Sequence, residues 1–371
     1  MPSPQATLRH CAAAVLLVTG AGCPTGALAT EPRLLSQQAG HEWKHRESGV
    51  RLPGQLAGAT LESVADSTDS ESDVTATYQD RSAGLTISVF LFRAGVPDAS
   101  LWLDRSLAPH RSGPQAIGKI DFASEIFATV TPPSGATDSA VYAVYPASGG
   151  PAASTAFGMV SAGEWLIGLR LSSRALSLTD LRAKVDATIR GLKLPRLGDA
   201  GPAYAVADCP DHLSTADAPR TADGDDDGMT SLILQLAVED AGRESKKTAV
   251  APTAARFCRE AAINASVSAY RLIGTRDSYV IATGDAGVTI TVGPSLMSAL
   301  EPGKPPRYDL SLVTVDRQLA YRGFTAVPSV LQAIRIVNGE MPVGSKGRTP
   351  ATRKNLNIDI KPPVGGAGKT P

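Results

Sequence analysis

Residues 163–195 read GEWLIGLRLSSRALSLTDLRAKVDATIRGLKLP, and the spacing of their apolar residues changes halfway along. Between residues 165 and 171 every second residue is large and apolar, which predicts a strand with one buried face. Between residues 178 and 192 leucine, valine and isoleucine recur every three or four residues, which predicts an amphipathic helix. Ser177 and Asp180 form a capping signal before this helix. The segment therefore predicts a helix that packs on a sheet.

The chain before this segment adds strands and one further helix. Alternating apolar residues over 74–92, interrupted by a turn at 80–84, predict a β-hairpin. Asp98 opens a helix through Leu107, and three more strands follow between residues 122 and 160. Short turns between consecutive strands favour antiparallel pairing. We therefore expect an α+β domain over residues 49–195, an antiparallel sheet with helices on one face.

This layout resembles that of a group of exported proteins. The Ser48-Gly-Val-Arg-Leu-Pro53 opening, the long hairpin, the central helix and the closing Gly163-Glu-Trp165 strand with its helix carry the resemblance. Over residues 42–195 the chain resembles uncharacterised exported proteobacterial proteins, and its layout is similar to the PsbP/DcrB-like α+β fold. The resemblance implies a non-catalytic envelope or accessory module.

A second domain is expected in the other half of the chain. Residues 196–228 are rich in Pro, Gly, Ala and Asp without periodicity, which is typical of a linker. Residues 229–338 contain two predicted hairpins, at 279–292 and 308–324, and a helix at 328–337. They predict a second α+β domain, and whether it duplicates the first stays open.

Three further segments of this half have their own predictions. Residues 256–262 around Cys258 are expected to form a helix, and the apolar residues 231–238 fit a helix or a strand. From residue 339 to 371 the chain is basic and rich in Gly and Pro, which predicts a flexible tail.

The N-terminus has the features of a secretory signal peptide. Arg9 precedes a short apolar run at 11–18, and Ala27-Leu28-Ala29 offers a cleavage site. Cleavage near Ala29 removes residues 1–29 and leaves a polar leader at 30–48. The apolar run is too short to be a transmembrane segment. We expect a periplasmic or secreted bacterial protein.

The cysteines agree with export. Lipidation at Cys23 is an alternative, although the usual leucine three residues before that cysteine is missing. Removal of the signal peptide leaves Cys209 and Cys258, and a pair of cysteines in an oxidising compartment predicts a disulfide. Closing a loop of about 50 residues would stabilise the chain by roughly 4 kcal/mol in the chain-entropy model.

Composition restricts the class of partner. The chain has 36 basic and 36 acidic side chains among 371 residues, so no global field attracts nucleic acid. Its 43% apolar content is sufficient for two cores. We expect the partner to be an envelope protein or a small ligand.

One motif points to zinc chemistry. Residues 41–45, His-Glu-Trp-Lys-His, match the HExxH pattern in which two histidines on one helical face bind Zn²⁺ and the glutamate polarises water. His41, Glu42 and His45 are thus the candidate residues of a zinc-dependent hydrolase. Their place in a polar leader, without a recognisable third ligand, favours instead a surface segment.

A second motif points to calcium. Asp223, Asp225 and Asp227 precede Gly228 with the spacing that opens a calcium-binding loop. Leu234 occupies the position of the bidentate glutamate, which favours an acidic linker. The sequence as a whole thus predicts a non-catalytic binding or accessory protein without a cofactor, with a zinc hydrolase and a calcium-stabilised envelope protein as alternatives.

Overall fold

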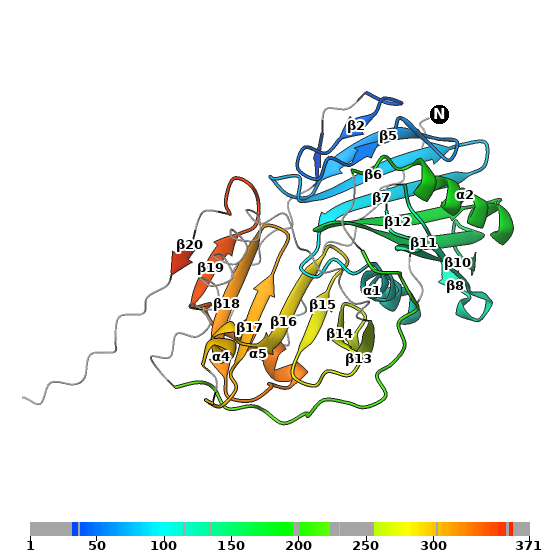
Figure 1. The fold of residues 1–371 in the computed structure, drawn as a ribbon. Coiled ribbons are helices and arrows are strands. Elements are labelled where there is room, and N and C mark those ends of the chain that lie inside the picture. The colour runs from blue at the N-terminus through cyan, green and yellow to red at the C-terminus, as the bar shows by residue number, and fades with distance from the viewer. Residues whose placement is uncertain are drawn as a thin grey trace, which may run out of the picture.

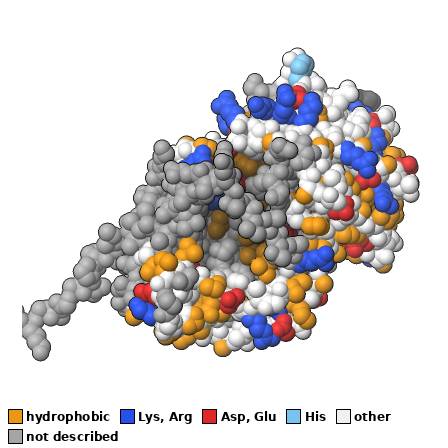
Figure 2. All heavy atoms as spheres, in the orientation of Figure 1, with side chains coloured by type: hydrophobic (Ala, Val, Ile, Leu, Met, Phe, Trp, Pro, Cys, Tyr) orange, Lys and Arg blue, Asp and Glu red, His pale blue; other side chains and the backbone are white. Residues whose placement is uncertain are grey.

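Two large antiparallel sheets with few helices make up the computed structural model, which describes residues 32–35, 38–113, 116–133, 135–195, 200–222, 230, 256–301, 303–353 and 356–358 (Figure 1). The predicted α+β class is confirmed at this level. Basic and acidic side chains are interspersed over the surface of the first sheet's half in the view of Figure 2. The predicted signal peptide and the segment 231–238 lie outside the described residues.

The first sheet has ten strands in the order β1-β5-β6-β7-β12-β11-β10-β8, with β4 beside β5 and β9 beside β10. These strands are β1 (Arg33–Leu34), β4 (Gln55–Leu56), β5 (Ala59–Asp66), β6 (Asp73–Asp80), β7 (Leu85–Arg93), β8 (Lys119–Ile120), β9 (Ile126–Val130), β10 (Ala140–Ser148), β11 (Ser154–Ala162) and β12 (Trp165–Ser173). A short 3-10 helix, Phe122–Ser124, precedes β9. The separate pair β2 (Trp43–Lys44) and β3 (Arg51–Leu52) lies in the predicted leader and just after it.

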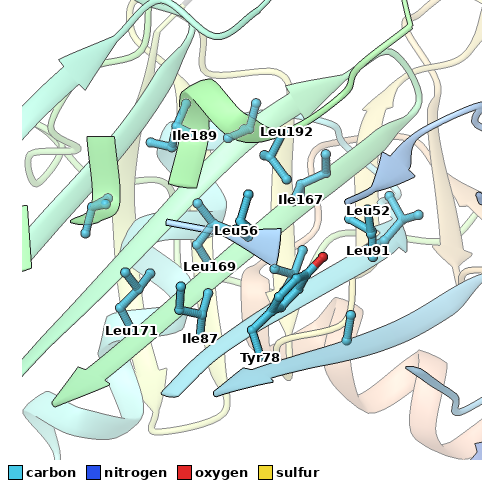
Figure 3. Packing of buried hydrophobic residues seen from close by; sticks show 14 of the residues in the cluster. Leu52, Leu56, Tyr78, Ile87, Leu91, Ile167, Leu169, Leu171, Ile189 and Leu192 are labelled. Carbon is cyan, nitrogen blue, oxygen red and sulfur yellow. The ribbon is translucent and has the colours of Figure 1, made fainter. Parts of the chain in front are cut away.

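Residues 163–195 fold as the spacing of their apolar residues predicts. β12 lies between β7 and β11, and α2 (Leu178–Gly191) begins after Ser177, whose hydroxyl accepts the Asp180 N–H at 3.1 Å. Ile167 and Leu169 of β12 pack with α2 residues such as Ile189 in the main apolar cluster (Figure 3). Burial of this alternate set fixes the register of β12, since a slip by one residue would turn it to the other face.

The prediction of helices on one face of the first sheet is wrong. α1 (Ala99–Arg111) covers the opposite face, where its Leu101 and Trp102 share a cluster with Leu166 and Phe157 of the sheet. β10 and β12 carry apolar residues on both faces of the sheet. The apolar side chains of each face are removed from water only when a helix covers that face. α1 thereby comes to lie against the second sheet as well (Figure 1).

The second sheet runs β13 to β20 in chain order. Its strands are β13 (Phe257–Asn264), β14 (Val267–Leu272), β15 (Tyr279–Thr283), β16 (Val288–Pro294), β17 (Tyr308–Val313), β18 (Arg317–Phe324), β19 (Gly344–Gly347) and β20 (Leu356–Ile358). α5 (Val330–Gly339) packs on it through Ala333 and Ile336, and the short α4 (Leu296–Leu300) links β16 to β17. This order differs from that of the first sheet, in which the late strand β12 lies beside β7.

Two sequence predictions fail in this half. Residues 256–262 do not form a helix, because 257–264 form β13, where Cys258 and Glu260 are tied to partners outside the strand. The tail predicted from residue 339 is wrong as far as residue 358, because β19 pairs with β18 and β20 with β19. β19 reads Gly-Ser-Lys-Gly, a sequence without the apolar alternation that would have indicated a strand.

The predicted linker crosses between the sheets along an ordered path in its described part, residues 200–222. The Ala203 N–H donates to the Asp138 carbonyl of the first half at 2.8 Å, and Cys209 forms a disulfide with Cys258 of β13. The S–S distance is 1.97 Å, so the predicted pairing of these cysteines is confirmed. Isolated bridges join Asp208 to Arg259 and Arg220 to Phe324. The start of the segment is therefore tied to the first half, and the part from Asp208 onwards is tied to the second sheet.

One buried carboxylate joins the two sheets. Asp104 of α1 accepts hydrogen bonds from Arg259 Nε of β13 at 3.0 Å and from the Tyr270 hydroxyl of β14 at 2.9 Å. Arg111, two helical turns further along α1, donates to the same carboxylate at 2.8 Å. Burial by itself would raise the pKa of Asp104, but the ion pairs with Arg259 and Arg111 lower it. The carboxylate is therefore held ionised between the sheets.

We expect Asp104→Ala to destabilise the protein by about 3–5 kcal/mol, because it leaves Arg259 and Tyr270 buried without their acceptor. Asp208→Ala is the matched control, since Asp208 also pairs with Arg259 but its side chain is 75% exposed. It should cost about 1 kcal/mol or less. Urea unfolding measures both, and equal losses would contradict the role assigned to Asp104.

Candidate functional site

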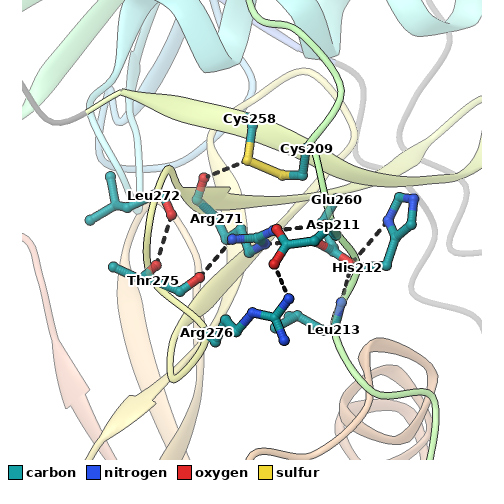
Figure 4. A network of polar contacts seen from close by, with 10 residues as sticks. All are labelled: Cys209, Asp211, His212, Leu213, Cys258, Glu260, Arg271, Leu272, Thr275 and Arg276. Carbon is teal, nitrogen blue, oxygen red and sulfur yellow. Dashed lines mark hydrogen bonds and ion pairs between the residues drawn. A yellow bond between two sulfur atoms is a disulfide. The ribbon is translucent and has the colours of Figure 1, made fainter.

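A complete polar network surrounds Arg271 of β14 (Figure 4). Its guanidinium donates to Glu260 Oε2 at 2.8 Å, to the Thr275 carbonyl at 2.7 Å and to the Asp211 carbonyl at 2.6 Å. Arg271 is 2% exposed, and every nitrogen of its guanidinium has a partner. Together with the neighbouring disulfide, this network fixes the crossing segment on the β13–β14 hairpin. Its donors are already used, so we assign it a structural role.

The candidate zinc residues do not form a metal-binding arrangement. Trp43 and Lys44 between the two histidines are in strand β2, whereas the HExxH pattern needs a helix to align its imidazoles. His45 Nε2 donates to the Glu71 carbonyl at 2.9 Å, and His45 Nδ1 accepts the Ser48 N–H at 3.0 Å. Glu42 pairs with Arg51 and Lys193 at 2.7 and 2.6 Å. Both ring nitrogens of His45 are therefore occupied.

His45 was expected in a surface segment, but its side chain is buried, with 1% of the residue exposed. Its ring lies 4.5 Å from the ring of Trp165, centroid to centroid, and Trp165 belongs to the main apolar cluster of the first sheet. Burial lowers the pKa of His45 to about 4, and the nearby Arg93 acts in the same direction. The imidazole is thus a neutral structural group.

We expect acid to destabilise the protein partly through His45. Because its pKa is lower in the folded state, the unfolded chain binds more protons between about pH 6.5 and pH 4, so the stabilisation present at pH 7 is lost as the pH falls. The loss attributable to this residue should reach about 2–3 kcal/mol.

His45→Gln should remove that part of the pH dependence of the free energy of unfolding. His212→Gln, at a side chain that is 71% exposed, is the control and should keep the wild-type pH dependence. Parallel curves for wild type and His45→Gln would contradict this explanation.

A second group of charged side chains gathers where the two sheets meet beside α1, and we call it the junction. Its members come from five places in the chain: Asp73 of β6, Arg105 and His110 of α1, Arg170 of β12, and Asp285 in the turn between β15 and β16. Asp285 acts electrostatically on Asp73, Arg105 and Arg170, and Arg170 acts on His110, and we group the five residues on this basis.

The β15–β16 turn reaches the first sheet because Gly287 permits it. The Gly95 N–H donates to the Gly287 carbonyl at 2.8 Å, and a Cβ on Gly287 would lie 2.8 Å from the Ala94 Cα. Gly287 also has a φ of +83°, a conformation that other residues rarely adopt. This close backbone approach positions Asp285 over the first sheet.

The arginines of the junction are incompletely bonded. Arg105 is 1% exposed; its Nη2 donates to the Ala265 carbonyl at 2.6 Å, while its Nε and Nη1 are closed to solvent and have no hydrogen-bond partner among the described residues. Arg170 is half-buried, and its side chain forms no hydrogen bond or ion pair within the described part of the chain. Its guanidinium carbon lies 5.7 Å from the centre of the Phe90 ring. Burial lowers the pKa of both arginines, and Asp285 opposes that shift.

Burial also changes the two other titratable groups of the junction. It raises the pKa of Asp73 to about 7, with Asp285 and Asp66 adding repulsion between carboxylates. It lowers the pKa of His110 to about 4, aided by Arg170. The His110 ring lies 4.7 Å from the Phe157 ring, and its Nδ1 is closed to solvent. Near pH 7 the junction thus holds a neutral histidine and a partly protonated Asp73.

We expect Asp73→Asn to stabilise the protein at high pH. The folded-state pKa of Asp73 is raised, so its stabilisation is complete below the ordinary value near 4 and is lost as the pH rises through about 7. Asparagine cannot ionise, so the variant should gain about 2 kcal/mol on wild type between pH 5 and pH 8, an amount reduced for partial exposure. Asp69→Asn, at an exposed neighbour, should show no such gain in urea unfolding.

Sequence reasoning did not find the junction. Its members are spread from residue 73 to residue 285, and no local motif connects them. The sequence does carry one signal, because Gly168 and Arg170 interrupt an otherwise apolar strand. A charged side chain on a buried strand needs charged or polar groups near it, and Asp285 of the β15–β16 turn is such a group for Arg170.

Comparisons with protein-family models, with curated proteins and with solved structures return no match for this chain. Among the described residues, no group of three or more His, Cys, Asp or Glu side chains is placed to hold a metal ion. The aspartates of the calcium hypothesis, Asp223, Asp225 and Asp227, lie outside the described residues. No helix in the described part of the chain is long and apolar enough to cross a membrane.

Proposed function

We propose that this chain is an exported, non-catalytic binding protein and that the junction holds its small ligand. The observation that carries the proposal is Arg170, a half-buried guanidinium without a hydrogen bond in the described structure, at the centre of the first sheet. The buried arginine of the other polar network, Arg271, has a partner for each nitrogen. Guanidinium donors that no described residue accepts can bind a ligand.

Export is supported by the disulfide and by the N-terminal sequence. A disulfide between Cys209 and Cys258 persists in the periplasm or outside the cell, where thiols are oxidised. The proposal includes cleavage after Ala29 and a periplasmic or secreted location. It keeps the relationship to the PsbP/DcrB-like fold, which the element order of strands, α1, strands and α2 supports. It also keeps two α+β domains, because each sheet has an apolar cluster of its own.

The proposal contains no catalytic step. His45 has both ring nitrogens bonded within the fold, and His110 Nδ1 is closed to solvent. His45 is therefore not placed to move a proton to or from a ligand, and the Nδ1 of His110 is not accessible to one. A zinc-dependent hydrolase would need His45 to release its bonds to Ser48 and Glu71. Binding requires no such rearrangement.

A thermal-shift screen of residues 30–371 against anionic, neutral and cationic metabolites tests the proposal. At least one anionic class should raise the melting temperature of wild type, since a ligand that binds the folded state stabilises it. The shift should vanish in Arg170→Gln and persist in Arg174→Gln, the same change at an exposed arginine after β12. Shifts that are absent for every class, or that survive in Arg170→Gln, would remove the junction as the binding site.

A further inference from the structure

We propose that the ligand of the junction is a small organic monoacid and that its carboxylate binds to the guanidinium of Arg170. This inference rests on the proposed function and adds to it the chemical class of the ligand. Three features of the junction lead to it: the shape of the free donor group, the balance of charge around it, and the rings beside it.

The donor group favours a planar acceptor. The side chain of Arg170 has no hydrogen bond to any residue that the structure describes, so its parallel N–H groups are unpaired within that part of the chain. A guanidinium matches a carboxylate with two parallel hydrogen bonds, and such charge-assisted pairs are about twice as strong as neutral ones. Arg170 faces Ser88 of β7 and Phe157 of β11 across the sheet. Ser88 is buried and offers a hydroxyl beside the same position.

The charge balance favours one negative charge. Arg105 and Arg170 each carry a positive charge, and Asp285 is the carboxylate that acts on both of them. Asp285 also acts on Asp73 of β6, and His110 of α1 is uncharged near pH 7. One positive charge of the two arginines therefore lacks a counter-charge from Asp285. A monocarboxylate neutralises it, whereas a dianion would leave a buried excess of negative charge.

Arg105 acts differently from Arg170. Its free nitrogens are closed to solvent, so they cannot touch a ligand in this conformation. Arg105 is therefore a positioning residue, whose charge raises the local potential while its Nη2 holds the Ala265 carbonyl of the β13–β14 turn. Arg170, which is half-buried, is the residue that contacts the ligand.

The surroundings of Arg170 favour an apolar body on the acid. Phe90 lies beside its guanidinium, and Phe157 is its cross-strand neighbour. Gly168 on the same face carries no side chain over Phe90, where a Cβ would lie 3.5 Å from the Phe90 Cβ. A glycine inside a strand weakens it and often marks the close approach of a ligand. Aromatic walls with one fixed charged group are typical of sites for small organic molecules.

Calorimetric titration of the disulfide-bonded protein, residues 30–371, tests this inference with acetate, benzoate and octanoate as probes. Benzamide is the uncharged counterpart of benzoate, and inorganic phosphate and succinate are the dianions. At least one monoacid should bind wild type, and benzamide should not bind. Arg170→Lys keeps the charge but loses the paired donors, so we expect about tenfold weaker binding or more. Arg170→Gln should abolish binding, and Arg174→Gln should leave it unchanged.

Each other outcome has a definite meaning. Equal binding of benzoate to wild type and Arg170→Gln, or no binding of any monoacid, overturns the inference. Binding of phosphate or succinate that depends on Arg170, without binding of a monoacid, overturns the ligand class but leaves the proposed function intact. When no probe here or in the thermal-shift screen depends on Arg170, both proposals fail. Far-ultraviolet circular dichroism of each variant shows that a loss of binding is not a loss of fold.

Discussion

The ion pair between Asp104 and Arg259 is the interaction on which the arrangement of the two sheets depends. It joins α1, which packs on the first sheet, to β13 at the edge of the second sheet. A buried charge that loses its partner is strongly destabilising, so α1 cannot separate from β13 at low cost. The Tyr270 hydroxyl adds a further bond to the same carboxylate. Arg105 and His110 of the junction lie on the same helix as Asp104.

The position of α1 explains why a polar corner exists inside the molecule. One side of this helix contributes Leu101 and Trp102 to the apolar cluster on the first sheet, while Asp104 and Arg105 reach groups of the second. A surface helix turns its polar face to solvent, but a helix that lies between two sheets has little surface to do so. Its charged residues must therefore find partners within the fold. Asp104 finds them completely and Arg105 only in part.

Local patterns in the sequence predicted the local elements well. The alternation over 165–171, the apolar spacing over 178–192 and the Ser177 cap were sufficient for β12 and α2, since each depends on neighbours within one or two turns. The hairpins β6–β7 and β15–β16 were found for the same reason. The pairing of Cys209 with Cys258 followed from counting alone, because the predicted cleavage of the signal peptide leaves two cysteines.

The failures share a physical cause, which is long-range contact. The helix-forming residues Arg, Glu and Ala of 256–262 were expected to form a helix, but a disulfide and the Glu260–Arg271 ion pair hold them in a strand. Alternation along a strand shows that two faces differ and not which helix covers each, so the placement of α1 was wrong. His45 looked like a surface residue because its partners Ser48, Glu71 and Trp165 are recognisable only in space.

The disulfide also determines how the chain responds to a break in its backbone. Cys209 and Cys258 are 49 residues apart, and the bond between them bypasses everything in that interval. A peptide bond cut anywhere between these cysteines would leave the two halves covalently joined, with the first sheet still attached to β13. The nicked protein would migrate as a single chain until a reductant opened it, and protease damage in that interval would not release the second sheet.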